Sequence, residues 1–316
     1  MELVRSPSND ACANCGAALT GEFCSVCGQK RFVASDRGFG SLLRQFMEAA
    51  TDLDGRFWGT LRALLTRPGR LSRDYIEGRR ARWMSPIALF LLVNLVYFVS
   101  AVQSDLATPF EWEVPGRIAL ESADPGARAA EDAARLRAEP GPLHSVITAP
   151  LVDRRIAERD AAVRAASNGE RGYHYRDYRD AYNAKVPEIS KVLTIVHVPL
   201  LGVALMLLFR NCRRYFAEHF VVALHLVAFF MAVIVIVDYG RDLLHLFVPA
   251  ADWHNMLLNW LIRIVLTVYI LIALRRAYAV GWVWSGAATL GLLASYVVIN
   301  VYLYRPVLFL TVFALT

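Results

Sequence analysis

Four cysteines are the residues in this chain whose type and spacing most clearly indicate chemistry. Cys12 and Cys15, then Cys24 and Cys27, form two Cys-x2-Cys pairs separated by eight residues, and a glycine follows each pair. Paired thiolates at this spacing are typical of tetrahedral zinc sites, and the glycines let backbone amides turn toward the sulfurs. The pattern predicts a zinc ribbon in which four thiolates close the coordination shell. Such a zinc is structural, because no position is left for a catalytic water.

Two other uses of the cysteines fit the sequence less well. A redox dithiol requires a βαβ context that so short a segment cannot supply, and an iron–sulfur cluster is less common at this spacing. Cysteines clustered in this way indicate a metal site in a reducing compartment rather than a disulfide framework. The chain begins MELVRSPSND, without the apolar core of a signal peptide. We therefore expect the ribbon to lie in the cytoplasm.

The rest of the chain is built from long apolar runs. Hydrophobic residues make up 56% of the 316 positions, and the mean hydropathy is +0.37. Runs able to approach a bilayer's thickness occupy residues 86–102, 190–209, 218–237, 256–274 and 282–304. The apolar stretch after Arg305-Pro306 is too short to cross again. The sequence predicts an all-α polytopic membrane protein of about five transmembrane helices with a small N-terminal four-cysteine zinc ribbon.

Arginines at the ends of these runs predict the orientation. With five crossings, three arginine-rich loops fall on one side: residues 79–82, 210–214 and 275–276. The positive-inside rule makes that side cytoplasmic, which places the N-terminus inside and the C-terminus outside. The net charge of +6 is then explained by the lipid bilayer as partner, so nucleic acid is not expected as one.

These features divide the chain into five regions. Residues 1–35 form the zinc ribbon, and residues 36–85 a cytoplasmic amphipathic helix followed by an arginine-rich segment at residues 70–83, which we call the basic collar. Residues 86–104 form the first transmembrane helix, 105–187 an extracytoplasmic hydrophilic loop, and 188–316 the remaining helices and tail. We expect partial helix in the loop at 126–138 and 153–166. The amphipathic helix should run from Phe39 to Leu65 and end at Pro68-Gly69, with these residues on its apolar face: Leu42, Phe46, Ala50, Leu53, Phe57, Leu61 and Leu64.

A few polar residues could carry other functions. His197 and His225 lie in different predicted helices at different depths, which favours hydrogen bonding over shared haem ligation. Arg263 lies inside the fourth run, and we expect it to reach the outer interface or to pair with Asp238. A tyrosine-rich stretch at residues 173–182 could bind a ligand, or could be an amphipathic helix that enters the second span.

Several sequence blocks together resemble the bacterial membrane-protein family known as domain of unknown function 3667. The blocks are Cys12 to Lys30, Leu53-Asp54-Gly55-Arg56, Arg67-Pro68-Gly69, Asp74 to Trp83, Pro86 and Leu89-Phe90-Leu91. The resemblance covers about the first hundred residues. It implies a bacterial inner-membrane protein with an N-terminal zinc ribbon, and it implies no particular activity.

The expected function follows from the modules present. We find no paired carboxylates, nucleophile elbow, phosphate-binding glycine loop or Ser/His/Asp arrangement, so there is no basis for naming a reaction. We expect a non-catalytic binding, regulatory or scaffolding protein whose zinc ribbon and basic amphipathic segment engage a cytoplasmic protein partner or the inner leaflet, with the helical bundle as anchor. A small-solute or ion transporter organised around Arg263 and a membrane-embedded lipid-acting enzyme are the alternatives. The sequence does not specify an oligomeric state.

Overall fold

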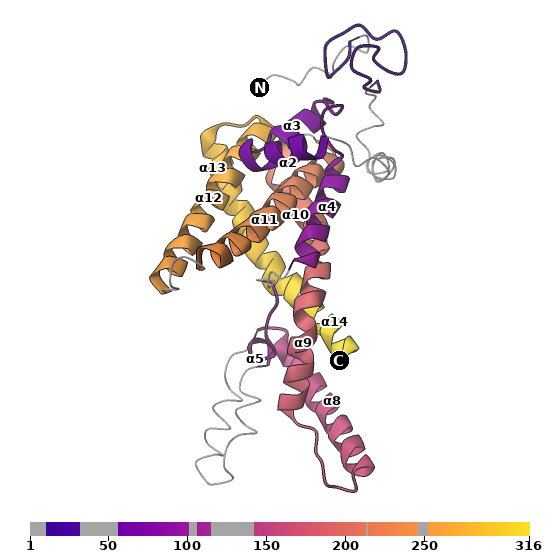
Figure 1. The fold of residues 1–316 in the computed structure, drawn as a ribbon, viewed down its shortest axis with the longest axis vertical. Coiled ribbons are helices and arrows are strands. Elements are labelled where there is room, and N and C mark those ends of the chain that lie inside the picture. Colours follow the sequence, from indigo (N-terminus) through magenta and orange to yellow (C-terminus); the bar gives the residue numbers. More distant parts are fainter. Residues whose placement is uncertain (1–10, 32–55, 101–105, 115–141, 213, 246–251) are drawn as a thin grey trace. The chain divides into compact units, whose positions relative to one another are not determined.

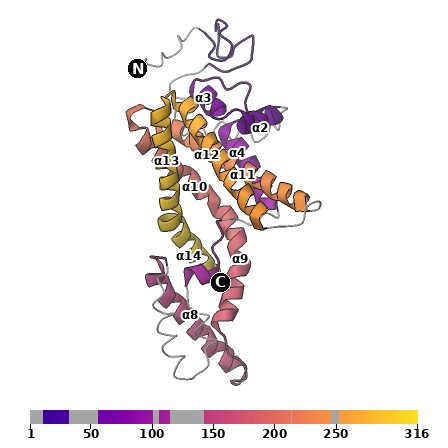
Figure 2. The same ribbon diagram turned by 90° about the vertical axis from the view of Figure 1, so that its left-hand side faces the viewer.

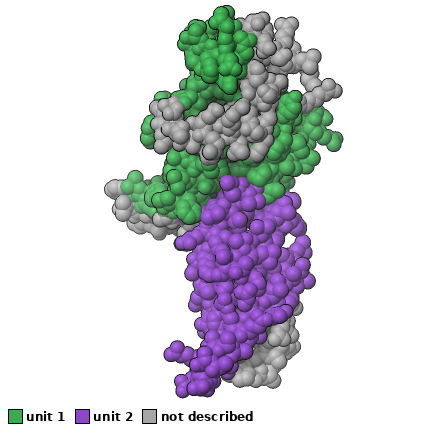
Figure 3. Space-filling view, turned by 90° about the vertical axis from the view of Figure 1, so that its right-hand side faces the viewer, with its two compact units in different colours: residues 1–102, 198–295 green, residues 103–197, 296–316 purple. Residues whose placement is uncertain are grey.

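The computed structural model describes residues 11–31, 56–100, 106–114, 142–212, 214–245 and 252–316. Within these ranges the regular structure is helical, apart from two isolated β-bridges in the cysteine-rich segment (Figure 1). The chain divides into two compact units, coloured separately in Figure 3. Unit 1 comprises residues 1–102 and 198–295, and unit 2 comprises residues 103–197 and 296–316.

Four helical segments in the described part are long and apolar enough to cross a membrane: Tyr175–Leu208, Phe216–Leu244, Met256–Tyr278 and Trp282–Leu315. The first and last segments include α10 (His197–Leu208) and α13 (Trp282–Val298), and the middle two make up most of α11 (Phe216–His245) and α12 (Asp252–Tyr278). These helices indicate a membrane protein. Asp238 lies within α11, because this helix continues beyond the apolar run at residues 218–237.

The first predicted crossing corresponds to α4 (Pro86–Val99), which is shorter than each of the four membrane-length segments. Its 14 residues span about 21 Å, less than the roughly 30 Å of hydrocarbon. Contacts show that it runs parallel to α11: Ile87 packs near Val221, and the Asn94 amide lies 3.7 Å from the Met231 sulfur. That α4 crosses the membrane in addition to the four longer segments stays a prediction. In the predicted five-helix topology, α4 and α11 are the first and third crossings and should run in the same direction, as they do here.

In residues 56–85, two short helices precede α4. The helix α2 (Arg56–Thr66) ends just before Pro68-Gly69, as predicted, and α3 (Arg70–Ile76) follows at once. The buried residues of α2 are Thr60, Ala63 and Leu64, of which only Leu64 belongs to the predicted apolar face; Phe57 and Leu61 are half-buried. Thr60 is buried because its hydroxyl accepts a hydrogen bond from the Met84 amide and donates one to the Arg56 carbonyl. Residues 39–55 of the expected helix lie outside the described residues.

Unit 1 gathers α2 and α3 against α11 and α12. The Tyr269 hydroxyl donates to the Leu64 carbonyl at 2.6 Å, and Arg276 donates to the Pro68 carbonyl at 2.9 Å. The Ser72 hydroxyl lies 2.9 Å from Nδ1 of His225. These bonds satisfy polar groups where the two helices meet the membrane-type helices, so α2 and α3 are integral to the unit.

Unit 2 contains a hydrophobic core that the sequence analysis did not anticipate. It is formed by α5 (Phe110–Glu113), α8 (Ser145–Ala166), α9 (Tyr175–Leu193) and α14 (Arg305–Leu315). The apolar stretch after Pro306 continues the helix that begins with α13, and α14 packs along α9 (Figures 1 and 2). Leu308, Phe309 and Val312 are completely buried in this core. The hydrophilic region therefore obtains apolar partners from a segment far away in the sequence.

Candidate metal centre and its docking site

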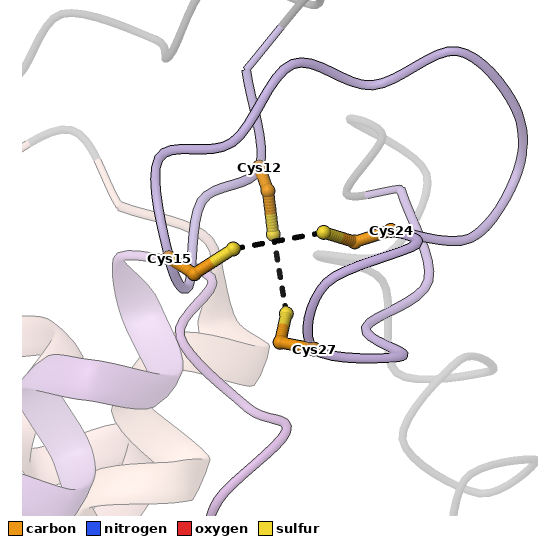
Figure 4. Close-up of side chains that lie close together, drawn as sticks. All are labelled: Cys12, Cys15, Cys24 and Cys27. Carbon is orange, nitrogen blue, oxygen red and sulfur yellow. Dashed lines mark hydrogen bonds between the residues drawn. The ribbon is translucent and has the colours of Figure 1, made fainter.

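The four N-terminal cysteines converge on one point (Figure 4). Their sulfurs all lie within 4.8 Å of one another, and both Cys12–Cys27 and Cys15–Cys24 are 3.6 Å apart. A zinc ion bonded to four thiolates at about 2.3 Å would separate them by roughly 3.8 Å. The arrangement thus fits a tetrahedral metal ion, as the spacing predicted, and four cysteine ligands leave its coordination complete.

Each cysteine pair is shaped by the same backbone turn. Gly16 donates to the Cys12 carbonyl, and Gly28 donates to the Cys24 carbonyl, both at 2.8 Å. The two glycines have φ values of 77° and 70°, a left-handed conformation that favours glycine. The repeated turn explains why a glycine follows each pair.

Hydrogen bonds favour the thiolate form of two of the cysteines. The Asn14 side chain and the Gln29 amide lower the pKa of Cys27 to about 6, and the amides of Cys27 and Val26 lower the pKa of Cys24. The pKa of Cys15 rises to about 12, because desolvation and the neighbouring sulfurs outweigh the Ala17 amide, which lowers it. Such a cluster keeps a proton that a bound cation would displace.

Gln29 joins the ribbon to the body of unit 1. Its side-chain amide donates to the Gly78 carbonyl, and its oxygen accepts from the amides of Arg80 and Ala81 at 3.0 and 3.1 Å. The Gln29 side chain is buried, with a relative exposure of 8%. The sequence around Gln29 does not predict this role, because the groups that Gln29 bonds to are about fifty residues away.

The turn that receives Gln29 is held by a buried carboxylate. Asp74 accepts two hydrogen bonds from Arg79, at 2.6 and 3.0 Å, and one from the Trp83 indole at 2.9 Å. The guanidinium of Arg80 lies 3.9 Å from the centre of the Tyr75 ring. Several side chains of the basic collar therefore have a structural role. Their hydrogen bonds to Asp74 fix the turn whose amides bind Gln29.

The remaining candidates from the sequence have separate environments. His225 contacts Ser72, whereas His197 lies 3.3 Å from the Asn300 side chain, so each histidine has hydrogen-bond partners of its own, as expected. Arg263 is exposed on α12 and lies 5.3 Å from the Trp260 ring. Of the two arrangements expected for Arg263, the pair with Asp238 is not seen. Asp238 instead forms an ion pair with Arg241 on its own helix.

The tyrosine-rich stretch is the helix α9, which confirms the amphipathic alternative. Tyr178 and Tyr182 are fully buried in the core of unit 2. They contact the Phe110 ring at centroid distances of 5.4 and 5.6 Å. The two tyrosines are therefore core residues.

Unit 2 also contains a buried charge cluster that the sequence did not reveal. Glu113 is completely buried, and its two oxygens lie 2.6 Å from Nε2 of His144 and 2.8 Å from Nε of Arg305. Burial tends to raise the pKa of Glu113, but its bonds with His144 and Arg305 outweigh burial and lower it. Glu113 thereby links α5, the start of α8 and the start of α14.

One family model matches the chain. The family described as protein of unknown function (DUF3667) matches residues 54–98. The matched residues comprise α2, α3, the turn that receives Gln29, and α4. Cys12 to Lys30 lies outside them. No curated protein and no solved structure matches the chain.

Proposed function

We propose that this chain is a non-catalytic inner-membrane protein of bacteria whose cytoplasmic zinc ribbon is a docked binding module. The docking of Gln29 on the turn at residues 78–81 is the observation that carries the proposal. Three hydrogen bonds to the buried Gln29 side chain hold the ribbon against the basic collar. Without these bonds the ribbon would be free to move relative to the rest of unit 1. Cys12, Cys15, Cys24 and Cys27 would hold one structural zinc ion, which fixes the position of Gln29.

The docked ribbon leaves apolar side chains available to a partner. Phe23 and Val26 are 59% and 72% exposed, and both lie next to zinc-ligating cysteines. Exposed aromatic and aliphatic residues on a rigid support are suited to binding a protein, because little conformational freedom is lost on association. We therefore assign the ribbon a cytoplasmic protein partner and a regulatory or scaffolding role.

The first test is the metal content of the full chain in detergent. Wild-type protein should contain one zinc ion per chain, and Cys24→Ser should lose most of it, because a closed four-thiolate site does not tolerate loss of a ligand. Cys212→Ser is the matched control and should keep the zinc. Equal zinc in wild type and Cys24→Ser would contradict the metal assignment.

Hydrogen exchange at the receiving turn tests the docking itself. The amides of Arg80 and Ala81 donate to Gln29, so both should exchange faster in Gln29→Ala and in protein stripped of zinc. The amide of Arg79 is an internal control, since it donates to the Asp74 carbonyl and should be unaffected by Gln29. Unchanged exchange at Arg80 and Ala81 in the zinc-free protein would separate zinc from docking and overturn the proposal.

A transporter is the second candidate, and one observation favours it. The two 34-residue segments are both irregular where they meet: a 3-10 turn, η2 (Thr194–Val196), lies in one and a π-helix, η4 (Ile299–Tyr304), in the other. Here His197 contacts Asn300 and lies 4.5 Å from the Tyr304 ring. Irregular helices often line substrate sites. Ion flux into proteoliposomes that is abolished by Asn300→Leu would favour transport over scaffolding.

A further inference from the structure

One end of unit 1 carries a set of exposed arginines contributed by several segments, which we call the arginine face. Its members are Arg62 and Arg67 near the end of α2, Arg210 after α10, and Arg275 and Arg276 at the end of α12; all five are exposed. Hydrogen bonds bring these segments together: Arg276 donates to the Pro68 carbonyl, and Arg214 donates to the Ala277 carbonyl. Loops widely separated in the sequence therefore form one basic surface.

The acidic residues near this surface do not neutralise it. Among the described residues of unit 1, Asp74 and Glu77 pair with Arg70, Arg73 and Arg79, and none of their recorded ion pairs involves the arginine face. Glu218 at the start of α11 is buried, and Asp238 and Asp242 lie toward the opposite end of that helix. Among the residues of unit 1 that the structure describes, the exposed charge on this surface is therefore positive.

Exposed aromatic residues border the same surface. Trp58 on α2 is 73% exposed, and Trp282 and Trp284 at the start of α13 are 58% and 49% exposed. The Arg275 guanidinium lies 4.2 Å from the centre of the Trp282 ring. Indole rings prefer the headgroup region of a bilayer, where the ring is partly apolar and its N–H remains hydrated. Their position beside the arginines selects a lipid surface over a soluble polyanion.

We propose that the arginine face, bordered by Trp58, Trp282 and Trp284, binds the phosphate groups of anionic phospholipids in the adjacent leaflet. Guanidinium groups donate paired hydrogen bonds to phosphate oxygens, and a negative leaflet attracts each arginine near its surface. The proposal requires only that these helices cross a bilayer. It does not depend on the role assigned to the ribbon.

The test compares the full chain in nanodiscs of phosphatidylcholine alone with nanodiscs that also contain phosphatidylglycerol. Native mass spectrometry of the protein released from mixed discs should show retained phosphatidylglycerol on wild type. The double variant Arg67→Gln/Arg275→Gln should retain much less, because each neutralised arginine weakens binding about fivefold. The pair Arg154→Gln/Arg164→Gln is the matched control, since it removes two exposed arginines from α8 without touching the arginine face.

A charge-preserving variant separates binding from folding. Arg67→Lys/Arg275→Lys keeps the positive charge and should retain most of the lipid, even if the glutamine variant is poorly folded. Equal phosphatidylglycerol retention by wild type and a folded glutamine variant would overturn the proposal. So would loss of lipid in the α8 control to the same extent, or displacement of the lipid by an RNA oligonucleotide that binds wild type more tightly.

Discussion

Gly69 lies directly against the backbone of Ala273 on α12. A Cβ atom built on Gly69 would be 2.4 Å from the Ala273 carbonyl oxygen and 2.8 Å from its Cα. The φ of Gly69 is 71°, a conformation that side chains with a Cβ rarely adopt. Glycine at this position is what allows the turn between α2 and α3 to dock on α12.

Gly69→Ala should therefore destabilise unit 1 by about 2 to 4 kcal/mol, because backbone strain and overpacking act together. Thermal unfolding in detergent measures the effect. Gly59→Ala is the matched control: Gly59 lies in α2 with open space around it, so alanine there should be neutral or slightly stabilising. Equal melting temperatures for Gly69→Ala and wild type would contradict the close packing.

Glu113→Gln should destabilise unit 2 by about 3 kcal/mol, because it leaves the Arg305 guanidinium without its buried counter-ion. Glu158→Gln is the control. The Glu158–Arg154 pair on α8 is exposed, and its loss should cost between about 0 and 1 kcal/mol. Urea unfolding followed by fluorescence of a tryptophan in unit 2 compares the two. Similar effects of the two variants would remove the structural role of Glu113.

Acid should weaken unit 2 through the same residue. The folded-state pKa of Glu113 lies below its unfolded value of about 4.3, so its contribution is fully present above that value. The contribution is lost as the pH falls through the lower, folded-state pKa. Melting temperature measured from pH 7 to pH 3 should fall more steeply in wild type than in Glu113→Gln. Parallel curves would show that Glu113 does not contribute to acid sensitivity.

Cysteine labelling in intact cells tests the orientation, in a Cys212→Ser background. An impermeant maleimide should react with Arg154→Cys in the exposed part of α8, and should spare Thr66→Cys at the end of α2. Permeabilised cells supply the control, since both positions should then react. The reverse pattern would place the ribbon outside the cytoplasm.

Arg263→Leu should leave expression and melting temperature close to wild type. The Arg263 side chain is exposed, and its recorded contact is with the Trp260 ring of the same helix. Leucine at an exposed position of a membrane helix removes the cost of a cation there, which is about 2.5 to 3.5 kcal/mol on insertion scales. A large loss of stability would indicate that Arg263 has a stabilising partner within the helical bundle.

The sequence was most informative where the signal is local. Cysteine spacing predicted the four converging sulfurs, and apolar runs predicted the membrane-type helices, because both depend on neighbours in the chain. Gln29 and Glu113 could not be identified in this way. Their partners, Arg80 and Arg305, are distant in sequence, and an isolated glutamine or glutamate has no pattern of its own. The polar region before α9 was taken as a loop for the same reason, since α14 supplies part of its core.

The position of α14 in that core has a consequence for biosynthesis. Arg305 follows Leu193, the last residue of α9, by 112 residues (305 − 193). At about 5 to 20 residues per second, a ribosome needs on the order of ten seconds to make this interval. Throughout that time the core that contains Tyr178, Tyr182 and Val152 lacks the apolar residues of α14. We therefore expect chaperones to bind the unfinished chain at the exposed apolar residues of this incomplete core. A tag or truncation near α14 should lower the yield of folded protein more than one placed before the ribbon.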